Sequence, residues 1–245
     1  MQKKKMKYPR FIKKIKTYEL LFISLIILLV SGCAYQGEKR FDLRDLNISS
    51  QQVLEKTELM LAAEAGDSGR IKEALEQGAR INHYTAEDKA FSLALKTGHE
   101  AISRILLSAG SDWDIGFSKG QSSALIVAAD QGFDDIVKML IVRAAPLEQK
   151  DENGYTALAK CAKNGHLTTL KILINAGAKV DVQPEGRSVL MHVVEKKNML
   201  LSQLIIAAGA DLDFSDADGD TALKIARRNG FYDLDLMLVQ AGARP

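Results

Sequence analysis

Apolar residues along this chain recur at helical spacing in short blocks that end at small residues. In the block LKILINA, Leu170, Leu173 and Ile174 fall on one face of a helix. The pair Gly177-Ala178 follows that block, and glycine readily ends a helix because it adopts the left-handed backbone conformation. The pattern therefore predicts short amphipathic helices, each stopped by such a pair, after which the chain turns outward into a finger-like loop.

The same block recurs with a period of about 33 residues. Glycine-alanine pairs or close variants are separated by 32, 34, 33, 32 and 33 residues, and a second marker opens each unit at the same intervals. Because one such unit cannot bury its apolar face alone, neighbouring units stack into a continuous core. The pairs begin at Gly78, Gly110, Ala144, Gly177, Gly209 and Gly242, and the openers are Thr57, Lys89, Ser123, Thr156, Ser188 and Thr221.

The best-preserved unit, DENGYTALAKCAKNGHLTTLKILINAGAKVD, spans residues 151–181 and closely resembles an ankyrin repeat, with its G-x-T-A-L, Gly-His and Gly-Ala elements. The last unit is similar, whereas the fifth carries Lys197 in place of the central glycine. The resemblance covers about residues 57–243. It implies an all-α ankyrin-repeat solenoid of about six helix-turn-helix repeats with short β-like fingers, the outer repeats being caps.

Several residues of the repeat have roles that follow from their chemistry. The Thr156 hydroxyl is suited to accept a backbone N–H at a helix start, and Gly165 and Gly230 are suited to end first helices in the left-handed conformation. The stretch from Ser50 to Gly66 has good helix formers, and Ser49 with Gln52 fits a capping box. We therefore expect an extended first helix that serves as the N-terminal cap.

The front of the chain has a different pattern. The first 16 residues carry eight lysines or arginines and no acid, and an uncharged, mainly apolar run follows from Leu20 to Val30. Eleven residues are too few to span a bilayer, which takes about 20, but the pattern is typical of a secretory signal. The end of the run, Val30-Ser31-Gly32-Cys33, resembles the lipobox of bacterial lipoproteins.

That resemblance implies that residues 1–32 are removed and that Cys33 is lipidated. Residues 33–49 then form a lipidated N-terminus and tether, and residues 50–245 form the repeat domain. The lipid places the protein at the bacterial cell envelope, and Ala34 after the cysteine favours the outer membrane, facing the periplasm. If Cys33 carries lipid, Cys161 has no disulfide partner.

Removal of the signal segment changes the charge of the protein. The whole chain is +2, with 33 basic and 31 acidic residues. Residues 1–32 hold eight of the basic residues and one of the acidic ones, so 25 and 30 remain, a net charge of −5. A mildly acidic protein lacks the clustered cations on which nucleic-acid binding rests.

The sequence contains no recognisable catalytic or metal-binding set. His99 and His166 lie in Gly-His pairs where the ankyrin pattern uses histidine to bond neighbouring loops, and no two histidines have metal-ligand spacing. In the acidic run DLDFSDADGD, alignment of Gly219 with the glycine of a calcium loop puts Phe214 and Ile225 where two ligands belong. We expect a non-enzyme that needs no cofactor or metal, has no small-molecule substrate, and is monomeric.

The family geometry implies exposed positions beside each G-x-T and after each alanine pair, and these positions predict a partner-binding surface. Tyr155 and Arg187 belong to the residue types most enriched among binding hot spots. The predicted contact residues are Phe117, Lys119, Ser122, Asp130, Gln131, Glu152, Asn153, Tyr155, Lys163, Asn164, Glu185 and Arg187.

The function that fits this reading best is a membrane-anchored protein-binding module or scaffold of the bacterial envelope. Two narrower roles compete with it: an immunity or inhibitor protein that neutralises a toxic envelope-acting enzyme, and a factor that helps an envelope enzyme stay folded or active. An enzyme of unknown type is the remaining class.

Overall fold

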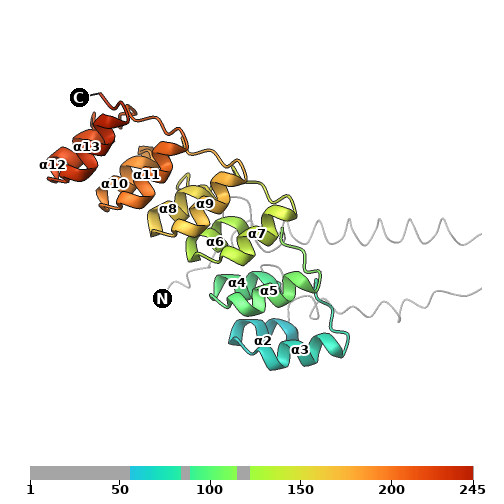
Figure 1. The fold of residues 1–245 in the computed structure, drawn as a ribbon. Coiled ribbons are helices and arrows are strands. Elements are labelled where there is room, and N and C mark those ends of the chain that lie inside the picture. The colour runs from blue at the N-terminus through green and yellow to red at the C-terminus, as the bar shows by residue number, and fades with distance from the viewer. Residues whose placement is uncertain (1–55, 84–88, 115–121, 245) are drawn as a thin grey trace, which may run out of the picture. The chain divides into compact units, whose positions relative to one another are not determined.

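The structure is a computed structural model that describes residues 56–83, 89–114 and 122–244. These residues belong to one compact unit of the chain. They form twelve α-helices, one 3₁₀ helix and no β-strand, and the α-helices stack as six consecutive pairs in two rows (Figure 1). The prediction of an all-α array of six repeats is confirmed, and the fingers that the structure describes are turns.

The helices are seven to nine residues long. The first helices of the pairs are α2 (Glu58–Ala65), α4 (Ala90–Lys96), α6 (Ala124–Gln131), α8 (Ala157–Asn164), α10 (Val189–Glu195) and α12 (Ala222–Arg228). The second helices are α3 (Ser68–Glu76), α5 (Glu100–Ser108), α7 (Asp134–Val142), α9 (Leu167–Asn175), α11 (Met199–Ala207) and α13 (Tyr232–Gln240). The 3₁₀ helix η1 (Pro184–Gly186) lies in the finger before α10.

The predicted openers are the N-cap residues of the six first helices. The Thr156 hydroxyl accepts the Ala159 N–H at 3.3 Å, as predicted. Lys89 is the exception, because the Ser92 hydroxyl accepts the Lys89 N–H instead. The Lys89 side chain is fully buried and donates to the Asp112 carbonyl at 3.2 Å, and burial lowers the pKa of its amine.

The prediction of an extended first helix beginning at Ser50 is wrong. Thr57 has an extended backbone, and its hydroxyl accepts the Met60 N–H, so α2 begins at Glu58. An N-cap residue cannot lie inside a continuous helix, because its non-helical conformation interrupts the hydrogen-bond ladder. The proposed capping pair of Ser49 and Gln52 lies outside the described residues.

Neighbouring repeats approach closely at the ends of the first helices. The His99 Nε2 lies 3.2 Å from the Glu64 carbonyl, and the His166 Nε2 lies 2.9 Å from the Asp130 carbonyl, so the predicted role of these histidines is confirmed. A Cβ on Gly132 would lie 2.6 Å from the His166 ring. A side chain at position 132 would therefore clash with His166 in addition to straining the backbone, which has φ of 74°.

Two repeats adopt the left-handed turn without glycine. The predicted turns at Gly165 and Gly230 have φ of 88° and 68°. Lys197 has φ of 54° where the other repeats have glycine after the first helix, and Ala144 has φ of 58° in place of the glycine of the Gly-Ala pair. A side chain in this conformation costs roughly 1–2 kcal/mol, so stacking holds these two turns in a conformation that their residues disfavour.

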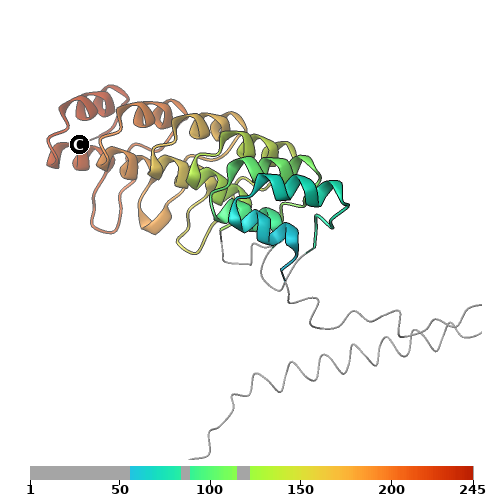
Figure 2. The same ribbon diagram turned by 90° about the horizontal axis from the view of Figure 1, so that it is seen from below.

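The described loops that precede α8, α10 and α12 project from one edge of the array (Figure 2). They carry the turn residues just before each first helix, so they bring the finger tips and the first helices to a shared surface. In the parts of the chain that the structure describes, no helix is long and apolar enough to span a bilayer.

Candidate functional site

The finger ends are tied to the last turns of the first helices by a recurring pair of side chains. One member directly precedes the helix-opening residue and the other lies eight residues later. The pairs are Lys56–Glu64 at 2.6 Å, Tyr155–Lys163 at 2.7 Å, Arg187–Glu195 at 2.9 Å and Asp220–Arg228 at 2.6 Å. The predicted position beside G-x-T and the predicted position after the alanine pair therefore contact each other within each of these repeats.

Tyr155 was predicted to be an exposed contact, and this is wrong. Only 1% of the residue is exposed, and the ring lies under the ammonium groups of Lys160 and Lys163, 4.7 and 4.3 Å from its centroid. The ring centroid is 5.9 Å from that of His192 in the next repeat. An aromatic ring gains more from this apolar and cationic packing than from water. Burial raises the pKa of the Tyr155 hydroxyl.

Three further predicted contacts join repeats to each other. The Gln131 amide donates to the Leu95 carbonyl at 2.8 Å, and the Asn164 amide donates to both the carbonyl and the side chain of Asp130 at 2.9 Å. These bonds satisfy carbonyls at the ends of first helices, which have no partner within the helix. Gln131, Asp130 and Asn164 therefore hold the array together, with Asn164 on its exposed surface.

Lys163, Glu185 and Arg187 belong to a charged network over the later repeats. Lys163 lies 3.8 Å from the Glu185 carboxylate. The Arg187 guanidinium pairs with Glu195 at 2.9 Å and with Asp216 of the next finger at 3.5 Å. Arg187 thereby links the fingers before α10 and α12, and its predicted hot-spot charge is already paired.

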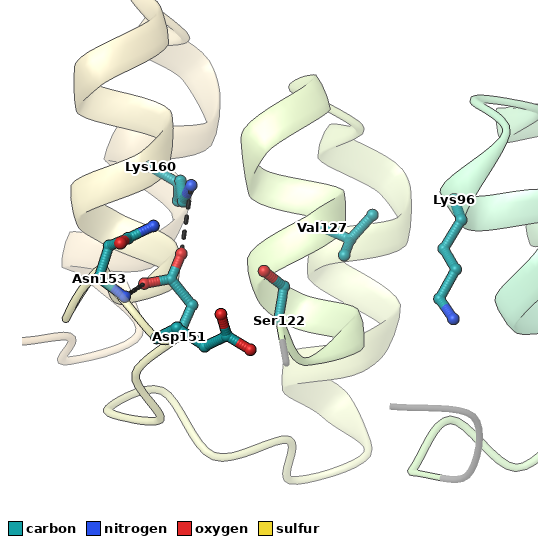
Figure 3. A pocket seen from close by; sticks show the side chains of 7 residues that line it. Lys96, Ser122, Val127, Asp151, Asn153 and Lys160 are labelled. Atoms are coloured by element: carbon teal, nitrogen blue, oxygen red, sulfur yellow. Dashed lines mark hydrogen bonds and ion pairs between the residues drawn. The ribbon is translucent and has the colours of Figure 1, made fainter. Parts of the chain in front are cut away.

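An open cavity lies beside the finger that precedes α8, with lining from α4, α6 and α8 (Figure 3). We call it the finger cavity; its volume is about 390 Å³. It brings together three of the predicted contacts with four residues that the prediction missed. Its lining comprises the predicted Ser122, Glu152 and Asn153 and the additional Lys96, Val127, Asp151 and Lys160.

One buried carboxylate organises the wall of the finger cavity. Asp151 Oδ1 accepts the backbone N–H of Asn153 at 3.0 Å and that of Tyr155 at 2.8 Å, and its side chain is only 6% exposed. The other oxygen pairs with the Lys160 ammonium at 3.2 Å. The turn therefore presents the Glu152 and Asn153 side chains outward on a fixed backbone, and both residues are exposed.

The lining residues that the prediction missed had a signal in the sequence. Lys160 lies four residues after its opener, where four other repeats have Leu61, Leu93, Val127 and Ile225 and the fifth repeat has His192. A lysine at a position that is apolar in most repeats needs a partner for its charge, and Asp151 is that partner. Phe117, Lys119 and Cys33 lie outside the described residues.

The groups that suggest chemistry are structural in the described residues. Cys161 is fully buried, its thiol donates to the Leu158 carbonyl, and burial raises its pKa strongly. His192 is buried with Nε2 3.3 Å from the Pro184 carbonyl. The carboxylates of Asp216 and Asp220 are engaged by backbone N–H groups and Arg228. Within the described parts of the chain, no group of three potential ligands is arranged to hold a metal.

Comparison with known proteins agrees with this architecture. A family model described as ankyrin repeats in three copies matches residues 59–146 and 114–184. The solved ankyrin repeat domain from Acinetobacter baumannii AYE is 30% identical with a TM-score of 0.66, over 76% of this chain and 98% of that one. The putative ankyrin repeat protein YahD of Escherichia coli K12 is 27% identical over 194 residues, which are 75% of this chain and 95% of that protein.

A stacked array of helical pairs with fingers along one edge is a repeat solenoid, and this chain belongs to the ankyrin-repeat family. Ankyrin repeats serve in general as modules that bind other proteins. Some relatives are much longer: the chain spans 7% of the Caenorhabditis elegans ankyrin repeat and KH domain-containing protein mask-1 and 16% of the Gallus gallus nuclear factor NF-kappa-B p105 subunit.

Proposed function

We propose that this chain is a protein-binding module whose partner engages the finger cavity and the adjoining ends of the first helices. The observation that carries the proposal is the cavity itself. It lies on the finger side of the array, and its rim offers the exposed Glu152 and Asn153 on a backbone that Asp151 fixes. A preorganised turn loses little entropy when it binds.

The charges of the cavity favour a polypeptide partner. Two cations, Lys96 and Lys160, and two anions, Asp151 and Glu152, line it together with amide and hydroxyl groups. A polyanion requires a surface of one sign, whereas alternating charge selects a partner with complementary donors and acceptors. The partner segment that fits is a polar loop or extended strand that carries both.

The proposal places this module at the bacterial envelope. Its support is the sequence from Val30 to Cys33, which follows a basic segment and a short apolar run. Lipid on Cys33 would tether the array at the periplasmic face of the outer membrane. Several acyl chains anchor a protein firmly, whereas one chain binds marginally.

The binding part is tested by cross-linking in intact cells followed by purification. Wild type, the double variant Glu152→Ala/Asn153→Ala and the control Lys138→Ala on the outer surface of α7 are compared. We expect the wild type and the control to retain one set of cross-linked proteins and the double variant to lose it at unchanged melting temperature. Equal recovery with all three would rule out the cavity as the binding surface.

The anchoring part is tested separately by labelling with radioactive palmitate. The Cys33→Ser variant is expected to lose the label and to leave the membrane fraction. Retention of label and membrane association by that variant would contradict the anchor without touching the binding surface.

A further inference from the structure

The outer surface of the second helices changes from charged to apolar along the array. The residue six positions before each Gly-Ala pair, or its variant, lies on this surface. It is a cation in the first four repeats, then an uncharged amide, and then an apolar residue. In chain order these residues are Lys72, Arg104, Lys138, Lys171, Gln203 and Leu236, and all are exposed.

The two last second helices extend this change into a patch. α11, with the sequence MLLSQLIIA, has no charged residue, and Leu200 on it is 63% exposed. On α13, Tyr232 and Leu236 lie one turn apart and are 83% and 58% exposed. A surface helix of a soluble protein normally carries polar residues on this side, and the terminal repeat of a solenoid in particular needs them.

A groove lies beside this patch. It has a volume of about 290 Å³ and lies between α9 and α11. Leu167, Leu200 and Leu204 contribute its apolar lining, and Lys171 lies at its edge. The molecule thus presents a protruding apolar residue, Leu236, on one side of α11 and an apolar groove on the other.

In place of the monomer expected from the sequence, we propose that this surface is a homodimer interface, in which two copies pack their α9–α11–α13 surfaces about a twofold axis close to α11. A twofold axis brings each protruding Leu236 to the groove of the other copy, because the protrusion and the groove lie on opposite sides of α11. An isologous interface requires a self-complementary surface of this kind.

The charges at the edges of the patch fit the same arrangement. Lys171 on α9 and Asp233 on α13 are both exposed, and neither forms an ion pair with another described residue. The twofold axis exchanges α9 and α13, so Lys171 of each copy comes to Asp233 of the other. Two equivalent pairs of opposite charge then flank an uncharged centre.

The exposed apolar area is sufficient for association. Leu200, Tyr232 and Leu236 together expose roughly 400 Å², the size of the largest apolar patch on a typical monomer, which is often functional. Two such patches contribute roughly 800 Å², so polar rims of roughly 200 Å² on each copy bring the buried area to about 1,200 Å², the lower end of specific interfaces. The acidic Asp233 beside Tyr232 disfavours an anionic membrane as the occupant.

The mass of the full chain in mild detergent, measured by sedimentation, tests the interface. Leu236→Glu is expected to raise the dimer dissociation constant at least about tenfold, because it places two charges in the apolar centre. Lys138→Glu at the equivalent position of α7 is the control and is expected to leave the dimer intact. Since Leu236 is exposed, both variants should melt as the wild type does.

A charge exchange makes the test specific for the proposed geometry. Lys171→Glu and Asp233→Lys are each expected to weaken the dimer, and the double variant is expected to restore it. A wild type that stays monomeric at high concentration, or a dimer that Leu236→Glu leaves unchanged, would overturn the proposal. Binding of monomeric protein to phosphatidylglycerol vesicles that Leu236→Glu abolishes would assign the patch to a membrane instead.

Discussion

Two finger junctions in this array are built on the same buried aspartate and differ in what pairs with it. Asp151 and Asp216 each lie three residues before a glycine and accept two backbone N–H groups of their own turn. Asp216 pairs with Arg187 of the preceding finger, whereas Asp151 pairs with Lys160 of its own first helix. Ser122 holds the position equivalent to Arg187.

The two junctions differ in what reaches across from the neighbouring finger. Arg187 reaches Asp216 from the preceding finger, whereas the Ser122 side chain is short and lines the finger cavity. Lys160 neutralises the carboxylate from within the repeat, so an arginine from the neighbour is not needed. The same turn can therefore pair its aspartate either with a cation of the neighbouring finger or with one of its own first helix.

The largest effect that we expect is a loss of stability when the Tyr155 ring is removed. Tyr155 lies at the boundary between the repeat that lines the finger cavity and the charged network of Lys163, Glu185 and Arg187. Tyr155→Ala is expected to lower the free energy of unfolding by about 3–4 kcal/mol, because it removes a buried ring. Tyr155→Phe keeps the ring and loses the Lys163 bond, at about 1 kcal/mol. Urea unfolding measures both; a Tyr155→Ala loss below that of Tyr155→Phe would contradict the packing described above.

Removal of either aspartate tests whether the two turns are equivalent. Asp151→Ala and Asp216→Ala are each expected to cost about 2 kcal/mol, because each leaves two backbone N–H groups without their acceptor and removes one ion pair of a cation. The double variants with Lys160→Met and Arg187→Met, respectively, should lose less than the sum of the single changes. Additive losses in thermal or urea unfolding would show that the ion pairs contribute nothing.

The two strained turns predict smaller changes of opposite sign. Lys197→Gly and Ala144→Gly are each expected to stabilise the array by about 1 kcal/mol, because glycine adopts positive φ without steric cost. Gly177→Ala is the matched control: a Cβ there meets no atom within 4 Å, so the loss of about 1 kcal/mol is conformational. Calorimetry that finds either glycine variant destabilised would contradict the assigned backbone.

The smallest expected effect is a pH dependence at His192, which holds the position equivalent to Lys160. Burial lowers the pKa of His192 in the folded protein, and nearby Arg187 and Lys163 lower it further. The folded state therefore binds fewer protons than the unfolded state, whose histidine has a pKa of about 6.5. Stability is full above that pH and is lost as pH falls through the folded pKa.

The His192→Leu variant lacks this contribution. The unfolding free energies of the wild type and His192→Leu are measured at pH 7.5 and at pH 5. The wild type should lose more unfolding free energy than the variant at the lower pH. A difference that is independent of pH would mean that His192 does not titrate on unfolding.

The fold follows from the sequence because its determinants are local and repeated. The openers, the glycine turns and the leucine spacing of α9 recur at one period, so each repeat supports the assignment of the others. The start of α2 did not follow, because helix propensity before Thr57 says nothing of the cap that interrupts it. The N-cap geometry of Thr57 decided that boundary.

The candidate site was predictable only in part. Ser122, Glu152 and Asn153 were identified because the resemblance to ankyrin repeats implies exposed positions beside each G-x-T. Tyr155 was not, because its burial depends on Lys160, Lys163 and His192 converging from two helices. The finger cavity depends on contacts between repeats: Asp151 pairs with Lys160 of its own repeat, and the neighbouring finger has Ser122 where another finger has Arg187. The sequence pattern of a single repeat does not show such contacts.

The most direct measurement is the affinity of the cross-linked partner for a protein in which Ser122 is replaced by arginine. Ser122→Arg is designed to give Asp151 the ion pair that Arg187 makes with Asp216, and its longer side chain is expected to occupy the finger cavity. It should weaken partner binding at least about tenfold, with a change in stability within about 1 kcal/mol. The reciprocal Arg187→Ser should leave binding intact. Unchanged affinity in Ser122→Arg would place the partner at another surface. The same conclusion would follow if Arg187→Ser lost binding and Ser122→Arg did not.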